Sequence, residues 1–332
     1  MNISKTAADL HRDMVVIDGL IIAKWSRQVF EDMVKGGLTT ANCTCSVWEG
    51  FVDTMANVAA WKRWLAENDD LLLQVHGIDD IHRAKREGRV GIILGWQNTF
   101  AIEGELDRLI LFRDLGVRFM QLTYNTQNLV GSGCWESVDR GLSDFGRDVV
   151  DEMNALGIAI DLSHVGEQTA ADAIEHSKKP VALTHCVPKG LLDMPRNKSD
   201  ALLKRAVDKG GFVGFAPYGP FLPTGPESTI DDCVAGMEYT IDLVGEDAFG
   251  IGTDFTQGHD DAFFAWLRHD KGNGRNLVRR LSGKPPNPAG LDGMKDYPNL
   301  TAVMLKRGWK EARIRKVMGE NWLNHLGRVW GS

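Results

Sequence analysis

The chain has 332 residues, of which 43% are hydrophobic and 25% charged, and its formal net charge is −7. This composition is typical of a soluble globular protein, and the absence of a basic run argues against nucleic acid or an anionic membrane as the main partner. The 5 cysteines show no disulfide framework, and no segment reads as a secretory signal or an apolar membrane span. We therefore expect a cytoplasmic protein.

The first half of the chain alternates apolar runs with helical patterns. Runs typical of strands buried on both faces cover residues 14–22, 39–47, 90–96 and 117–124. Helical periodicity lies between these runs, at residues 53–69, 79–87 and 106–115. The long loop 125–141, rich in glycine and polar residues, follows the fourth strand, and we expect it to shape a site.

The second half continues the same alternation. It contains strand patterns at residues 158–162, 181–183, 212–215 and 249–253. Its helical patterns cover residues 143–156, 167–177, 199–208, 230–244, 300–306 and 310–329. Eight strands, most followed by a helix, predict a (β/α)8 TIM barrel that forms a single domain over residues 1–332. We expect residues 271–293 to form a loop excursion, and the C-terminal helices within 298–330 to pack on the barrel.

Two successive predicted strands each end on a histidine, His164 after Ser163 and His185 after Thr184. In parallel α/β proteins, ligands and catalytic groups gather at the C-terminal ends of the strands. Imidazoles one βα unit apart would lie side by side, as in a metal site or an acid/base pair. The alternative is that each histidine only makes a hydrogen bond at the corner of its strand.

Asp254 follows the last predicted strand, in the segment GTDFTQG. A carboxylate that faces two histidines can ligate a metal, or hold a nucleophilic water and take its proton. The alternative is that Asp254 is an ordinary turn residue.

At these residues the chain resembles the membrane (renal) dipeptidases, which are zinc barrels of the amidohydrolase, metallo-dependent hydrolase type. The resemblance covers almost the whole chain and is carried by GLSDFGRDVVDEMNALGIAIDLSHVGEQT, VALTHC, DMPRN, GIGTDF and GENWLNHLGRVW. It implies that His164 and His185 are metal ligands and that Asp254 handles the proton of the bridging hydroxide. It also implies that Arg196 holds the substrate carboxylate and that the protein is a homodimer.

The chain departs from the family at the other metal ligands. Where the family has Asp-Gly-His-Asn-Asp on its first strand, this chain reads DGLII, so Leu20 and Ile22 occupy the two ligand positions. The bridging glutamate of the family falls on Gln97, and the histidine of its fourth strand falls on Tyr124. Hydrocarbon side chains cannot coordinate a metal, and an amide is a poorer zinc ligand than a carboxylate. The two-metal mechanism of the family therefore cannot run here unchanged.

The main interpretation is a dipeptidase-like hydrolase that holds at most one divalent metal, with zinc as the expected ion. His164 and His185 would bind the ion, with Asp254 or the Gln97 oxygen, and the substrate would be a dipeptide or another small amide carrying a carboxylate.

Two alternatives stay open. In the first, no metal binds, and Asp254, His164, His185 and Tyr124 perform acid/base chemistry as a hydrolase or lyase. Substrate-binding residues would then be the Arg196 cation, the Gln97 amide, and Leu20 and Ile22 as an apolar wall. In the second alternative the barrel binds a small molecule without turnover.

Overall fold

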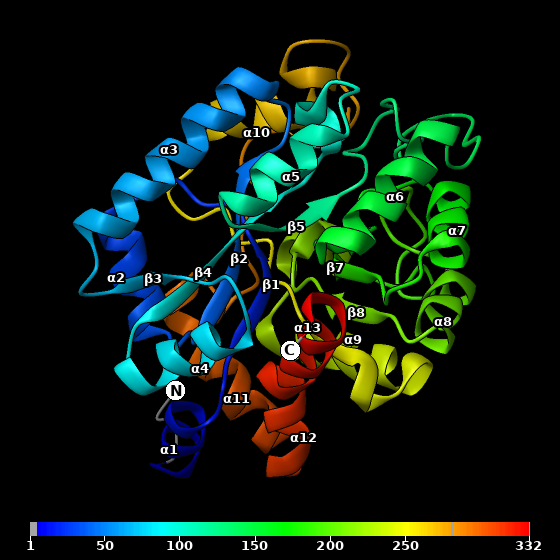
Figure 1. Cartoon of the computed structure of the whole chain (residues 1–332). Helices are drawn as coiled ribbons and strands as arrows, with labels where there is room; N and C mark the ends of the chain where they lie inside the picture. The colour runs from blue at the N-terminus through cyan, green and yellow to red at the C-terminus, as the bar shows by residue number, and fades with distance from the viewer. Residues whose placement is uncertain (1–4, 280–281, 332) are drawn as a thin grey trace.

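The computed structural model describes residues 5–279 and 282–331, and at its centre is a closed barrel of parallel strands (Figure 1). The strands pair in the order β2-β1-β9-β8-β7-β6-β5-β4, and pairing of β2 with β4 closes the ring. The barrel strands are β1 (Ile17–Ile21), β2 (Thr40–Ser46), β4 (Val90–Trp96), β5 (Val117–Gln121), β6 (Ala159–Asp161), β7 (Ala182–Cys186), β8 (Phe212–Phe215) and β9 (Phe249–Ile251). The predicted (β/α)8 fold is confirmed.

One additional strand, β3 (Leu72–Gln74), was not predicted. It pairs with the first half of β4, Leu72 opposite Val90, whereas β5 pairs with the second half of β4. It is as short as β6 and β9, and the apolar run LLLQV at residues 71–75 is its signal in the sequence.

Helices surround the barrel, as Figure 1 shows. They are α1 (Lys5–Asp13), α2 (Arg27–Lys35), α3 (Phe51–Glu67), α4 (Ile78–Glu87), α5 (Asp107–Asp114), α6 (Asp144–Leu156), α7 (Glu167–His176), α8 (Asp200–Asp208), α9 (Ile230–Val244), α10 (Asp261–Arg268), α11 (Tyr297–Lys306), α12 (Glu311–Arg315) and α13 (Asn321–Trp330). Helices α1, α2 and α10 were not predicted from the sequence, although each segment is amphipathic at helical spacing. Side-chain caps fix several starts: the Ser143 hydroxyl accepts from Gly146 N at α6, and Thr229 and Asp232 form a capping box at α9.

The C-terminal helix α13 closes the bottom of the barrel, at the N-terminal ends of the strands. The fully buried indole of Trp322 donates to Ile251 O at 2.9 Å. A β-carbon on Gly19 would lie 2.4 Å from this ring, and one on Gly250 would lie 2.9 Å from it. The two glycines therefore make room for the indole that fills this end, which leaves the opposite rim for a site.

In its described part, the connection between α10 and α11 contains 3₁₀ turns at Asp270–Gly272 and Met294–Asp296 and isolated β-bridges at Asn276 and Ala289. The predicted excursion 271–293 lies here, and its residues 280–281 lie outside the described residues. The predicted last helix, 310–329, is divided into α12, a π-helical turn at Lys316–Glu320, and α13. Across the described chain, no helix has the combination of length and apolar character needed to cross a membrane.

Candidate active site

The histidine corner, residues 161–164 and 184–185, lies where β6 and β7 end. It is built around the buried carboxylate of Asp161, whose Oδ1 accepts from the backbone N–H groups of Ser163 and Thr184, each at 3.0 Å. The Thr184 hydroxyl donates to Asp161 Oδ2 at 2.6 Å. These bonds join the two strand ends and place His164 and His185 next to each other.

The two imidazoles of this corner face each other with unprotonated nitrogens. His164 Nδ1 donates to Asn125 Oδ1 at 2.8 Å, because an amide oxygen only accepts. The Thr184 hydroxyl uses its proton on Asp161, so it accepts from His185 Nδ1 at 2.7 Å. The two Nε2 atoms are 3.0 Å apart. Because burial holds the pKa of both imidazoles well below the usual value, two neutral lone pairs converge here. The two Nε2 atoms can therefore share one proton or bind one cation between them.

Arg196 lies beneath the same corner and is 1% exposed. Its Nη1 donates to Ser163 O at 2.8 Å and its Nη2 to His185 O at 2.7 Å, while its buried Nε has no hydrogen-bond partner. The guanidinium lies 5.0 Å from the ring centre of Phe221. No carboxylate in the described residues lies within ion-pair distance of Arg196. A buried cation held only by neutral groups favours an anionic ligand.

The aliphatic corner, residues 18–22 and 253–254, lies where β1 and β9 end. Asp18 Oδ1 accepts from the N–H groups of Leu20 and Thr253 at 2.9 Å, and its Oδ2 accepts the Thr253 hydroxyl at 2.5 Å. Asp254 follows with the left-handed φ of 56°. Burial raises the pKa of Asp254 to about 7, against the opposing effect of the Arg196 cation. A carboxyl with this pKa can both accept and return a proton near neutral pH.

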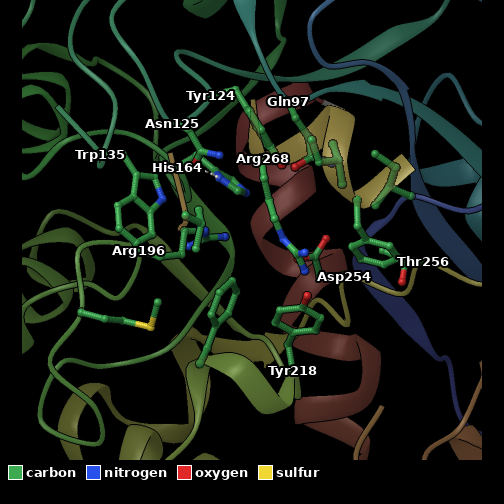
Figure 2. A pocket seen from close by; sticks show the side chains of 16 residues that line it. Gln97, Tyr124, Asn125, Trp135, His164, Arg196, Tyr218, Asp254, Thr256 and Arg268 are labelled. Carbon is green, nitrogen blue, oxygen red and sulfur yellow. Dashed lines mark hydrogen bonds between the residues drawn. The ribbon is translucent and has the colours of Figure 1, made fainter. Parts of the chain in front are cut away.

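A cavity of about 80 Å³ opens between the two corners (Figure 2). It is lined by Ile22, Gln97, Tyr124, Asn125, Trp135, His164, Met194, Arg196, Tyr218, Phe221, Asp254, Thr256, Phe264, Leu267, Arg268 and Val278. Six of the residues singled out from the sequence therefore meet at one cavity. His185 and Leu20 are buried outside this lining, at 0% and 1% exposure. His185 can act only through His164 or at the shared nitrogen site, and Leu20 contributes packing behind the wall.

In the cavity lining, Tyr124 supplies a hydrogen-bond donor and Gln97 supplies a hydrogen-bond acceptor. The Tyr124 ring stacks on His164 with centroids 4.2 Å apart, and burial raises the pKa of its hydroxyl, which therefore stays protonated. Gln97 Nε2 donates to Thr44 at 3.0 Å, whereas its buried Oε1 has no partner among the described residues. The cavity thus offers a neutral O–H donor and an unsatisfied amide oxygen.

Sequence reasoning did not single out Arg268, Tyr218 or Asn125 as site residues. Asn125 belongs to the loop that was expected to shape a site. Arg268 ends α10 and lies beside Asp254 in Figure 2. Tyr218 follows β8 and is hydrogen-bonded to Arg268. An eight-residue helix outside any motif gives no signal that its last side chain reaches the rim, so Arg268 could be found only from the structure.

The donor set does not fit the two-metal centre that the resemblance implies. Leu20 and Ile22 offer no ligand atoms, and in the described part of the chain no three His, Cys, Asp or Glu side chains are grouped to hold a metal. A single ion has a better fit, because the Nε2 atoms of His164 and His185 converge and the Gln97 oxygen is unsatisfied nearby in the cavity lining.

Comparisons with known proteins identify the family and the fold to which this chain is similar. Residues 6–269 and 277–331 match the family described as membrane dipeptidase (Peptidase family M19). A crystal structure of an amidohydrolase from Pseudomonas aeruginosa is 54% identical with a TM-score of 0.96, over 98% of this chain and 99% of that one. Dipeptidase tcpJ of Claviceps purpurea (strain 20.1) is 30% identical over 83% of this chain, and the uncharacterized dipeptidase C965.12 of Schizosaccharomyces pombe is 30% identical over 84%.

The chain spans 60% and 62% of the lengths of these two curated relatives. Its match to the family, in contrast, extends over nearly the whole of this sequence and includes both corners of the site. The chain belongs to the membrane dipeptidase family, Peptidase family M19.

Proposed function

We propose that the chain hydrolyses a small amide that carries a carboxylate, such as a dipeptide, in the cavity between the two corners. One observation supports this most directly: Asp254, with a pKa of about 7, and the buried cation of Arg196 line the same cavity. The first supplies a proton acceptor near neutral pH, and the second supplies a counter-charge for the substrate.

Substrate binding begins with Arg196. Two backbone carbonyls hold its guanidinium in place, so its Nε–H and its positive charge remain for the ligand. Arg268 adds a second guanidinium to the lining. Two cations and one half-ionised carboxyl give the cavity a net positive charge, which favours an anionic substrate over a neutral one.

The chemistry is assigned to Asp254 and Tyr124. Asp254 takes a proton from a water molecule while the water oxygen forms a bond to the amide carbon. The Tyr124 hydroxyl donates a hydrogen bond to the developing oxyanion. Asp254 then returns the proton to the leaving nitrogen as the carbon–nitrogen bond breaks, so protons balance over the cycle. A single zinc ion, when bound, would be held by the Nε2 atoms of His164 and His185 and would polarise the amide carbonyl.

The test combines a substrate screen with metal analysis. The purified protein, prepared without chelator and with zinc supplied, is assayed on dipeptides and N-acyl amino acids and on the same compounds with the carboxylate converted to a primary amide. We expect hydrolysis of the free carboxylates and about 100-fold lower kcat/KM for the capped compounds, since a buried charge pair contributes about 3 kcal/mol.

Mass spectrometry of the metal content distinguishes the mechanisms. About one equivalent of zinc, lost in the His164→Ala/His185→Ala protein, supports the one-ion hydrolase. Turnover without metal supports the acid/base enzyme instead, and an unsaturated product identifies a lyase. Binding of carboxylates with no turnover of any compound overturns the proposal in favour of a binding barrel.

A further inference from the structure

A second cavity, of about 210 Å³, lies on the other side of Ile22 from the candidate active site. It is lined by Ile22, Ala23, Trp25, Thr44, Cys45, Ser46, Val47, Glu49, Asn57, Trp61, Trp64, His259, Phe263 and Trp266. These residues lie at or shortly after the ends of β1 and β2, on α3, on α10 and in the loop before α10. The family pattern has a metal-binding aspartate at the position of Ile22. In this chain the Ile22 side chain lines the second cavity instead.

The lining is rich in indoles. The rings of Trp25 and Trp61 are 4.7 Å apart, and those of Trp61 and Trp64 are 5.2 Å apart at 85°. Phe263 and Trp266, from α10, lie 5.7 Å from each other. The face of an aromatic ring attracts a cation, and Trp is the most effective residue in this role, so a small space lined by several rings favours a cationic ligand.

The acidic residue in this lining is Glu49, and neutral groups hold its carboxylate. Its Oε2 accepts from the backbone N–H groups of Val47 at 2.7 Å and Trp48 at 3.0 Å, and its Oε1 accepts from Asn57 Nδ2 at 3.3 Å. No lysine or arginine lines this cavity, and within the described residues no cation is in ion-pair distance of Glu49. The negative charge of Glu49 is therefore oriented but not neutralised.

The imidazole of His259 does not supply the missing positive charge. It stacks on Phe263 with centroids 3.3 Å apart, and burial lowers its pKa to about 4. It is therefore a neutral aromatic wall at physiological pH. The candidate active site has the opposite character, because Arg196 and Arg268 line it.

We propose that the second cavity is a binding site for a small organic cation, such as an alkylated ammonium group, held by its indole walls and the Glu49 carboxylate. The cavity is smaller than the roughly 300–1,000 Å³ of pockets for drug-sized ligands, so the cation is a small one. An ammonium that carries its charge on methyl groups suits these walls, because it needs no hydrogen-bond acceptors and gains from ring faces. The site goes beyond the proposed hydrolysis and does not depend on it.

The experiment uses choline and 3,3-dimethylbutan-1-ol, which have the same shape and differ in the charge. Titration calorimetry on the full chain is expected to show choline binding at least about tenfold tighter than the neutral alcohol, from cation–π attraction and Glu49 together. Equal affinity for the two probes would mean that the cavity recognises shape alone and would overturn the proposal. Lack of binding by either probe would overturn it as well.

Two matched variants locate the bound cation. Glu49→Gln keeps an oxygen for the two backbone N–H groups and removes the charge, and we expect about fivefold or greater loss of choline affinity. Asp254→Asn makes the same change in the neighbouring cavity and should leave choline binding unaltered. Loss with Asp254→Asn and not with Glu49→Gln would place the cation in the candidate active site and overturn the proposal.

A third variant guards against failure of Glu49→Gln to fold. Trp266→Leu changes a half-buried residue on α10 and is expected to weaken choline about tenfold while affecting the neutral alcohol less. Equal weakening of both probes would contradict a cation–π role. Because all three measurements record binding, they remain interpretable even if no substrate for hydrolysis is found.

Discussion

The histidine corner and the aliphatic corner have the same backbone plan and different chemistry. In each, a buried aspartate accepts from the N–H group two residues later and from both the N–H and the hydroxyl of a threonine at the C-terminal end of a neighbouring strand. Asp161 holds Thr184 in this way, and Asp18 holds Thr253. The aspartate–threonine clamp is thus present twice, once beside histidines and once beside aliphatic side chains.

The difference lies in what each clamp presents to the cavity. The first places His164 on the cavity lining and, directly after Thr184, His185 buried behind it. The second places Ile22 and, directly after Thr253, Asp254 on the lining. The aliphatic corner forms the same clamp although Leu20 and Ile22 cannot bind a metal, so the clamp does not require metal ligands beside it. Ligands can therefore be exchanged for hydrocarbon at one corner while the proton acceptor and the other corner stay in place.

Removal of the proton acceptor should have the largest effect. We expect Asp254→Asn to lower kcat about 10³-fold, since Asn tolerates the left-handed backbone but cannot take a proton. In the wild type, kcat/KM should rise with pH through about 7 as Asp254 ionises, and the residual activity of the variant should lack this rise. An unchanged pH profile in Asp254→Asn would assign the titration to another group.

The two clamps should be of similar importance to folding. Asp161→Ala and Asp18→Ala each leave buried N–H and hydroxyl donors without an acceptor, and each should lower the free energy of unfolding by about 3 kcal/mol. Urea denaturation measures both. The matched control is Asp139→Ala, a half-buried carboxylate that also accepts several bonds but lies outside both corners. A large loss in one clamp variant with none in the other would show that a single corner supports the rim.

Tyr124 contacts both corners, because it stacks on His164 and packs in one apolar cluster with Ile22. Tyr124→Phe keeps this packing and removes the hydroxyl. We expect kcat to fall about 100-fold with little change in KM, as for loss of one oxyanion donor. An equal change in KM instead would make the hydroxyl a substrate-binding group. Tyr239→Phe, a surface hydroxyl bonded to Asp200, serves as the control.

The sequence was sufficient for the barrel, because parallel strands buried on both faces read as continuous apolar runs. It also predicted that His164 and Asp254 lie at one rim, since strand ends on one side of a barrel converge. Arg196 was identified only through the family resemblance. It could not separate Leu20, buried outside the cavity lining, from Ile22, which lines the cavity, because that depends on side-chain direction at a strand end. Arg268, the second arginine of the cavity lining, could not be predicted from the sequence, because it lies on a short helix outside the strand pattern.

The smallest expected effect is on how the free energy of unfolding depends on pH, to which Asp254 and the two buried histidines contribute in opposite directions. The folded-state pKa of Asp254, about 7, lies above its ordinary value of 3.8, so the folded protein holds this proton more tightly than the unfolded chain. The stabilisation is complete below about pH 4 and is lost as the pH rises toward 7. The buried histidines have lowered pKa values and change stability in the opposite direction. Comparison of wild type with Asp254→Asn isolates the carboxylate.

A shift of this size corresponds to about 4 kcal/mol, and the contact of Asp254 with the cavity reduces it to about 2 kcal/mol. Asp254→Asn should therefore gain about 2 kcal/mol relative to wild type between pH 4 and pH 8, measured by urea unfolding at each pH. A constant difference across this range would mean that the Asp254 carboxylate is solvated in the folded protein. The aliphatic corner would then present an ordinary carboxylate, and the contrast between the corners would reduce to the histidines alone.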